Sequence, residues 1–267
     1  MLGAIAGDII GSVYEKRNLK RKDFFPLFHP QARFTDDTVC TVAIADALLN
    51  DRNPVHSLQD WGQRYEYVGG WGQRFALWLV ADNPQPYGSW GNGGAMRVAS
   101  AALLARSLEE VMELSYAVTA ITHNHPEGLR GAQASAVAIW GALQGQTAQS
   151  IRNQVTEHFG YDLATTVDAI RPSYRHSEAA HLSVPQALVC ALEADSYEDA
   201  VRNAVSIGGD SDTIAAIAGA VAEARFGLPT EVAAKAWGFL DRDMRAILTQ
   251  LYQAHANLPT KTPGSSA

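Results

Sequence analysis

The sequence predicts an all-α fold, and three observations support this prediction. Apolar residues recur with the spacing of an α-helix along most of the 267 residues, whereas the alternation typical of β-strands is rare. Apolar residues make up 47% of the chain and charged residues 18%, which is typical of a globular protein. Many helical segments are rich in alanine and glycine, and small side chains let helix axes approach closely. We therefore expect a compact single-domain bundle of many helices rather than a long coiled coil.

The predicted helices follow one another along most of the chain. Ser107 and Glu110 form a capping box, which predicts that a helix begins at residue 108. Gly69 and Gly70 interrupt the periodicity of another segment and predict a break there. The predicted helical ranges are 2–15, 36–50, 57–81, 94–106, 108–121, 127–144, 147–159, 184–194, 197–207, 213–226 and 231–254.

Three connections are predicted to be irregular, and the chain is predicted to end in a tail. Residues 16–34 are basic and then aromatic, residues 82–93 are rich in proline and glycine, and residues 171–183 are polar with two histidines. Long loops in compact helical proteins are often functional. The composition predicts one domain over residues 1–256 and a flexible C-terminal tail over residues 257–267.

Charge, cysteine content and hydropathy exclude several classes of protein. The formal net charge of −7 argues against a nucleic-acid-binding surface, because a phosphate backbone needs a basic face. Cys40 and Cys190 each lie in an apolar stretch and are interpreted as core residues of a reducing compartment. No segment approaches the roughly 20 apolar residues of a membrane span, and the N-terminus lacks the basic region of a signal peptide. We expect a cytoplasmic monomer with no membrane partner.

Two acidic clusters each stand at the start of an apolar helix. Aspartate and threonine are common at helix starts, so capping is one interpretation. Each cluster nevertheless contains two carboxylates and a hydroxyl, which is more than a cap uses, and neither has a lysine or arginine beside it. Adjacent carboxylates raise one another's pKa unless a cation compensates. The first acidic cluster is Thr35, Asp36 and Asp37, and the second acidic cluster is Asp210, Asp212 and Thr213.

The donor types of these clusters predict a centre of hard divalent cations. Carboxylate and hydroxyl oxygens suit Mg²⁺ or Mn²⁺, whereas Zn²⁺ prefers nitrogen and sulfur ligands. If the two helix starts meet in space, their oxygens are sufficient for two neighbouring ions, with water completing each shell. Paired ions of this kind are typical of metal-dependent hydrolases. We therefore predict a hydrolase with two Mg²⁺ (or Mn²⁺) ions.

A glycine-rich motif, SWGNGGAMR at residues 89–97, lies at the start of a predicted helix. Glycines bunched there expose backbone N–H groups that can bind phosphate, and the tryptophan could stack on a nucleobase. The alternative is a tight turn with a core tryptophan. The motif is not a Walker loop, because no Gly-Lys-Ser/Thr follows, and its glycine spacing does not fit a dinucleotide fingerprint. The candidate ligand-binding residues are Ser89, Trp90, Gly91, Asn92, Gly93, Gly94 and Met96.

A His-x-His pair, His123 and His125, raises the question of zinc. No cysteine or third histidine follows at ligand spacing, so a zinc site is not favoured. A loop that places His123 against a ligand and a plain loop both fit the sequence.

The N-terminal segment combines a face of small residues with two acids. Gly3, Gly7 and Gly11 recur every four residues and form one smooth helix face for close packing. Asp8 lies among apolar neighbours, so we expect it to be buried with polar partners. Glu15 ends the predicted helix, and by itself it is interpreted as an ordinary surface glutamate.

Taken together, these motifs resemble the ADP-ribosylglycohydrolase family. The resemblance rests on GDIIGSVYE, FTDDT, SWGNGGAMR with THNHPEG, and GGDSDT in this order, and it extends from about residue 2 to residue 228. It implies an all-α fold with a binuclear Mg²⁺ or Mn²⁺ centre at the base of a cleft. It also implies a substrate that contains ADP-ribose, including ADP-ribosylated proteins.

The resemblance also implies roles for particular residues. The two acidic clusters match the metal ligands of the family. Residues 89–94 match the loop that cradles the diphosphate, with Trp90 as an adenosine contact, and His123 matches a residue of the ligand cleft. Glu15 matches a mobile acid that caps the metal site in some members. The catalytic residues implied in this way are Glu15, Asp36 and Asp212.

The implied reaction is hydrolysis of the glycosidic bond between ADP-ribose and an acceptor, with release of ADP-ribose. The acceptor stays open among arginine, serine and small molecules, because the chain is short for the family and residues 222–225 depart from its small-residue spacing. Two other functions also stay open. One is a non-catalytic ADP-ribose-binding or crystallin-like structural protein, and the other is a binuclear-metal phosphoesterase.

Overall fold

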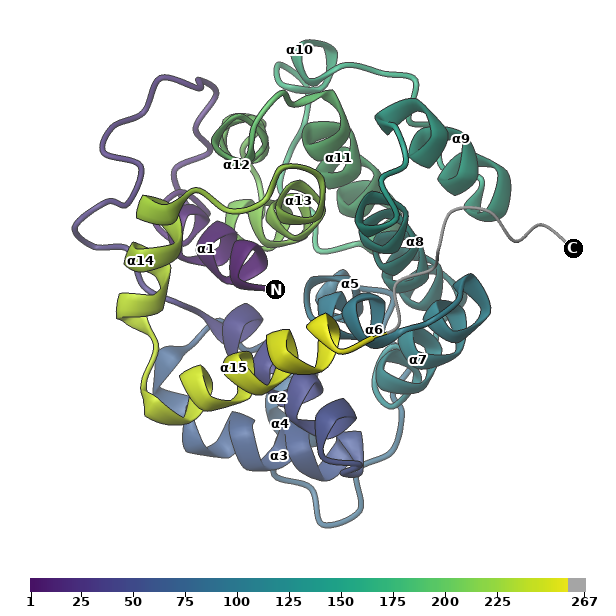
Figure 1. Cartoon of the computed structure of the whole chain (residues 1–267). Helices are drawn as coiled ribbons and strands as arrows, with labels where there is room; N and C mark the ends of the chain where they lie inside the picture. Colours follow the sequence, from purple (N-terminus) through teal and green to yellow (C-terminus); the bar gives the residue numbers. More distant parts are fainter. Residues whose placement is uncertain (259–267) are drawn as a thin grey trace, which may run out of the picture.

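The structure, a computed structural model that describes residues 1–258, confirms the all-α prediction (Figure 1). Within these residues there is no strand, only an isolated β-bridge between Gly91 and Ala179. None of the described helices has an apolar stretch of the length that a membrane span needs. The elements are α1 (Leu2–Gly11), α2 (Asp36–Leu49), α3 (Pro54–Arg64), the 3₁₀ helix η1 (Glu66–Val68), α4 (Gln73–Leu79), α5 (Gly93–Met96), α6 (Ala99–Leu104), α7 (Leu108–Ala120), α8 (Pro126–Leu143), α9 (Ala148–Phe159), α10 (Val167–Ile170), α11 (Ala180–Glu193), α12 (Tyr197–Ser206), α13 (Ser211–Phe226), α14 (Thr230–Phe239) and α15 (Arg242–Ala256).

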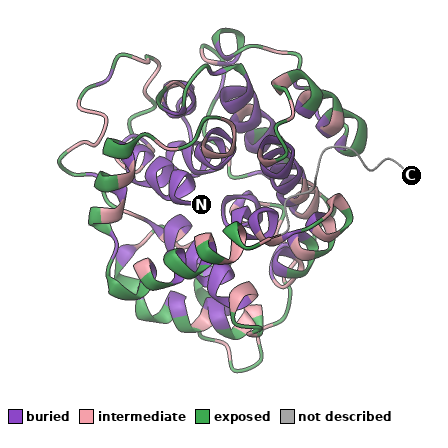
Figure 2. Ribbon diagram, in the orientation of Figure 1, coloured by how far each residue is buried: buried purple, intermediate pink, exposed green. Residues whose placement is uncertain are grey.

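Helices α1 and α13 pack against each other at the centre of the body. Figure 2 shows both as largely buried, together with the inner faces of α8 and α11, whereas α9 and α14 expose much of their surface. The glycine face predicted on α1 is what allows this contact. A Cβ atom at Gly7 would overlap the carbonyl group of Ala215, and one at Gly11 would overlap that of Ser211. The close crossing brings the start of α13 beside the end of α1.

Several helix ends differ from the prediction, and a local cap or a tertiary contact is found at each of them. The first helix ends at Gly11, where the Ser12 hydroxyl donates to the carbonyl of Ile9 at 2.9 Å and the chain continues in turns. The range 94–106 is divided into α5 and α6 at Arg97, whose side chain crosses to the end of α7. The range 231–254 is divided into α14 and α15, because Asp241 caps a new helix by accepting from the backbone N–H of Met244.

Other predicted features of the helices agree better with the structure. The capping box is present, since the Ser107 hydroxyl accepts from the backbone N–H of Glu110 at 3.1 Å. The break at Gly69 and Gly70 is also present, with φ of +71° and +90°. The irregular range 171–183 is shorter than predicted, because α11 begins at Ala180. The boundary of the domain at residue 256 stays a prediction, and most of the predicted tail, from residue 259 on, lies outside the described residues.

Candidate metal centre and ligand cleft

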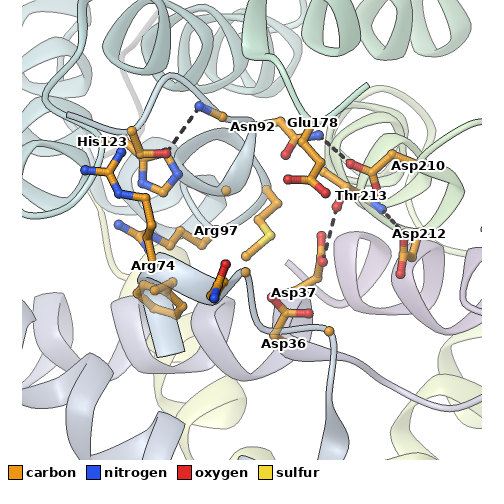
Figure 3. A pocket seen from close by; sticks show the side chains of 18 of the residues that line it. Asp36, Asp37, Arg74, Asn92, Arg97, His123, Glu178, Asp210, Asp212 and Thr213 are labelled. Atoms are coloured by element: carbon orange, nitrogen blue, oxygen red, sulfur yellow. Dashed lines mark hydrogen bonds between the residues drawn. The ribbon is translucent and has the colours of Figure 1, made fainter. Parts of the chain in front are cut away.

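The starts of α2 and α13 meet at the base of a cleft of about 350 Å³ (Figure 3). This volume falls within the range of small-molecule sites, roughly 300–1,000 Å³. The predicted site residues that line the cleft are Glu15, Asp36, Asp37, Ser89, Trp90, Gly91, Asn92, Gly93, Met96, His123, Asp210, Asp212 and Thr213. Two predicted residues do not line it. Thr35 is the buried member of the first acidic cluster, and Gly94 is also buried, with a Cβ position 2.7 Å from the methyl group of Thr119.

The first acidic cluster caps a helix and also contains a carboxylate oxygen without a hydrogen-bond partner. Thr35 caps α2, because its hydroxyl accepts from the backbone N–H of Asp37 at 3.3 Å. The Asp37 side chain is buried, and its Oδ2 accepts from the hydroxyl of Thr213 at 3.3 Å, which joins the two clusters. The other carboxylate oxygen, Asp37 Oδ1, is buried with no hydrogen-bond partner. A buried carboxylate oxygen without a donor is costly, so this atom fits a cation as its partner.

The second acidic cluster follows a sharp turn and is tied to the glycine motif. Gly208 and Gly209 have φ of +72° and +78°, which other residues rarely adopt, and they lead the chain into the start of α13. Asp210 occupies the N-cap position without making a side-chain capping bond. Its Oδ2 accepts instead from the Asn92 amide at 2.7 Å. Asp212 Oδ1 accepts from the backbone N–H of Thr213 at 3.0 Å.

Burial and mutual repulsion disfavour the ionised form of these acids. Burial raises the pKa of Asp36 to about 8, and the charges of Asp8, Asp210 and Glu15 add to the effect. Burial and neighbouring carboxylates also raise the pKa of Asp37 and Asp212 well above the ordinary range. No ion pair within residues 1–258 includes any of these three acids. An oxygen-only set of crowded carboxylates therefore fits a hard divalent cation.

Asp8 belongs to the same constellation, and the sequence interpretation did not assign it to the site. Oxygens of Asp8, Asp37 and Asp212 all lie within 4.8 Å of one another, so this buried cluster could hold a metal ion. Asp8 is nevertheless occupied by donors. Its Oδ1 accepts from the Thr35 hydroxyl at 2.8 Å, and its Oδ2 accepts from the backbone N–H groups of Thr35 and Thr38 and from the Thr38 hydroxyl. Asp8 therefore holds the first acidic cluster in place from behind, and its apolar sequence surroundings were the only signal.

The glycine motif forms one wall of the cleft. Trp90 has 51% of its surface exposed and lies at the rim, so the alternative of a core tryptophan is wrong. The backbone N–H of Asn92 donates to the carbonyl of Glu178 at 2.8 Å, and the N–H of Ala180 donates to the carbonyl of Trp90 at 3.0 Å. These bonds attach the motif to the loop before α11. They also place Glu178, which the sequence interpretation missed, in the cleft lining.

His123 and His125 have separate positions. His125 caps α8, because its Nδ1 accepts from the backbone N–H of Glu127 at 3.1 Å. His123 is buried in the cleft wall, and its Nδ1 lies 2.7 Å from the Thr122 hydroxyl. Burial and the nearby charge of Arg97 lower the pKa of His123 well below its usual range, so the ring is neutral. Of the two, only His123 lines the cleft.

The wall opposite the second acidic cluster is basic and aromatic. Figure 3 shows Arg74, Arg97 and His123 together on one side, across the cleft from Asp210 and Asp212. The guanidinium of Arg74 lies 4.8 Å from the centre of the Tyr87 ring. The sequence interpretation missed the two arginines. Arg97 is the last residue of the glycine motif, which was a usable signal, whereas Arg74 lies on α4 and had none.

Comparisons with known proteins identify the family of this chain. The ADP-ribosylglycohydrolase family matches over residues 1–258. The chain is 26% identical to ADP-ribosylhydrolase ARH3 of Mus musculus, over 92% of this chain and 88% of that protein. It is 27% identical to ADP-ribosylhydrolase ARH3 of Homo sapiens, over 85% of this chain and 84% of that protein. A solved structure titled "ADP-ribosylglycohydrolase-related protein complex" superposes with a TM-score of 0.67 at 21% identity, covering 95% of this chain and 97% of that one. The chain belongs to the ADP-ribosylglycohydrolase family.

Proposed function

We propose that this ADP-ribosylglycohydrolase-family protein hydrolyses the glycosidic bond between ADP-ribose and an acceptor, releasing free ADP-ribose, with two Mg²⁺ (or Mn²⁺) ions as cofactors. The acceptor is an ADP-ribosylated side chain such as arginine or serine, or a small ADP-ribose conjugate. The observation that carries the proposal is the meeting of the two acidic clusters at the base of the cleft, where Asp37 Oδ1 lacks a donor.

The clusters and Glu15 divide the chemistry between them. The ligands that would hold the ions are the first and second acidic clusters, and bound ions supply positive charge that orients ribose hydroxyls and lowers the pKa of a water molecule. Cleavage of a glycosidic bond passes through an oxocarbenium-like transition state, so the carboxylates of Asp36 and Asp212 stabilise the positive charge that develops at the anomeric carbon. Glu15 lies in the turn after α1 and lines the cleft, where it can move a proton at the bond being cleaved.

The remaining wall residues bind the ADP moiety. The glycine motif from Ser89 to Gly93 faces the diphosphate, and His123 and Met96 lie beside it in the lining. Trp90 is half-exposed at the rim and offers a flat apolar surface to the adenine ring. The cleft is thus acidic where the ribose that is released would lie and basic where the phosphates would lie, which suits an anionic ligand with a glycosidic bond at one end.

A product assay tests this proposal. Arginine-linked, serine-linked and O-acetyl-ADP-ribose substrates are incubated with Mg²⁺, with Mn²⁺ or with a chelator, and products are separated by chromatography. We expect metal-dependent release of ADP-ribose from at least one substrate, reduced at least 100-fold in Asp36→Ala and Asp212→Ala, since each substitution removes a charge directed at the transition state. Asp243→Ala, which removes an exposed carboxylate paired with Arg64, serves as the matched control.

The other outcomes identify the other functions. Activity that persists in both aspartate variants would place the chemistry elsewhere. AMP and ribose phosphate as products would identify diphosphate cleavage and a phosphoesterase. Tight ADP-ribose binding with no hydrolysis of any conjugate would identify a non-catalytic binding protein.

A further inference from the structure

Arg97 is a buried cation without a carboxylate partner. Its side chain is 1% exposed, and no ion pair in residues 1–258 includes it. Its Nη2 donates to the Thr122 hydroxyl at 2.7 Å and to the carbonyl of Val118 at 3.3 Å, while its Nε has no partner. An arginine keeps its proton in a folded protein, so this buried group always donates and never accepts.

The hydrogen bond from Arg97 to Thr122 fixes the direction of the hydrogen bond between Thr122 and His123. The Thr122 hydroxyl is fully buried, and its oxygen already accepts from Arg97. Its own hydrogen needs an acceptor, and within the described residues the only one is His123 Nδ1, at 2.7 Å. If His123 Nδ1 carried the proton instead, the buried Thr122 hydrogen would have no acceptor, and a buried unsatisfied donor is costly. The chain of donors therefore runs from Arg97 through Thr122 to His123.

The other ring nitrogen of His123 faces the glycine motif. A Cβ atom at Gly93 would lie 3.0 Å from His123 Nε2, and one at Gly91 would lie 3.8 Å away. The absence of side chains at these glycines leaves Nε2 adjacent to the cleft that His123 lines. Nε2 makes no hydrogen bond to any residue between 1 and 258. In a neutral ring whose Nδ1 accepts, Nε2 carries the proton.

We propose that Arg97 and Thr122 are positioning residues that keep the His123 proton on Nε2, so that His123 presents one fixed N–H donor to an anionic oxygen in the cleft. The ligand class is a phosphoryl oxygen of a diphosphate, an assignment that rests on the proposed function. In many proteins a buried carboxylate or carbonyl fixes the tautomer of a histidine by accepting from one ring N–H. Here the direction is reversed: Arg97 donates to Thr122, and Thr122 donates to His123 Nδ1, which is therefore an acceptor. A fixed neutral donor needs no proton from solvent when the ligand binds.

Nitrogen NMR of the intact protein tests the proposal without any substrate. Long-range ¹H–¹⁵N correlation spectra distinguish the protonated from the bare ring nitrogen of each neutral histidine, and comparison with His123→Gln identifies the His123 signals. We expect the proton on Nε2 and a bare Nδ1 in the ligand-free protein. A His123 ring with its proton on Nδ1, or an even mixture of the two tautomers, would overturn the proposal.

A matched pair of variants tests the role of the hydroxyl. Thr122→Val keeps the shape of the side chain but removes the hydroxyl, so we expect a mixture of the two His123 tautomers. We also expect the affinity for ADP-ribose, measured by calorimetry, to fall about tenfold, which corresponds to the loss of roughly one hydrogen bond to a charged group. Thr122→Ser retains the hydroxyl and should keep the Nε2–H tautomer. An unchanged tautomer in folded Thr122→Val would refute the positioning role. If His123 has the expected tautomer but ADP-ribose does not bind to the unaltered protein, the proposed function fails and the assignment of Arg97 and Thr122 stands.

Discussion

Raising the pH from 5 to 8 in the absence of divalent cations should destabilise this protein. Burial raises the pKa of Asp36 to about 8 from an ordinary value of 3.8, and it also raises the pKa of Asp37 and Asp212. The unfolded chain ionises such a carboxyl group near its ordinary pKa, whereas the folded protein resists ionisation until the raised pKa is reached. The stability that the neutral group contributes is therefore complete below pH 3.8 and is lost as the pH rises toward 8.

The magnitude follows from the pH range and from the position of Asp36 in the cleft. Each pH unit between the two pKa values changes the free energy of unfolding by about 1.4 kcal/mol, so the interval from pH 5 to pH 8 corresponds to ~4 kcal/mol in a dry site. Asp36 lines an open cleft, and water there screens the charge, which reduces the effect to ~2 kcal/mol. For a chain of this size each kcal/mol lowers Tm by about 2–4 °C, and half of the effect falls between pH 6.5 and pH 8, where Tm should fall by ~2–4 °C.

Differential scanning calorimetry across this pH range, with a chelator or with Mg²⁺, measures the effect. Mg²⁺ should reduce the fall, because a bound cation stabilises the ionised carboxylates, and Asp36→Asn should flatten the curve without metal, whereas the exposed Asp243→Asn should not. His123 acts in the opposite direction. Its lowered pKa means that stability is lost as the pH falls below about 6.5, the ordinary histidine value, so the decisive interval is pH 6.5–8. A metal-free Tm that stays constant or rises in this interval refutes the reasoning.

Two further substitutions test the packing behind the site. Asp8→Asn replaces one acceptor oxygen with a donor facing Thr35, so we expect the affinity for Mn²⁺ to fall about tenfold. Electron paramagnetic resonance of the free ion measures this affinity. An unchanged affinity would show that Asp8 does not support the cluster. Gly7→Ala places a methyl group against the carbonyl of Ala215 at the crossing of α1 and α13 and should cost about 3 kcal/mol in urea unfolding. The matched control is Gly238→Ala, where nothing lies within 4 Å of the new methyl group, and stability there should be unchanged or slightly higher; equal losses at both positions would contradict the packing argument.

Local sequence patterns were sufficient for most helices, because periodicity, capping and glycine breaks act over a few residues. The capping box at Ser107 and the break at Gly69 are examples. Helix ends were less predictable where a residue acts through a distant partner. The continuous helix expected over 94–106 is interrupted at Arg97, whose guanidinium donates to Thr122, 25 positions along the chain.

For the site, local sequence patterns were enough to predict the chemistry of the donors: two acid-rich helix starts with no adjacent cation, a glycine motif and one histidine. Which of these groups meet depends on how the helices pack. The packing of the start of α2 against α1 and α13 brings Asp37 Oδ2 within 3.3 Å of the Thr213 hydroxyl, although the two residues are 176 positions apart. Tertiary packing likewise places Asp8 behind Asp36 and Asp37, and Arg97 behind His123. Neither position is encoded in a local pattern, because a side chain's partners in a helical bundle depend on how the helices cross, and that depends on packing over the whole chain.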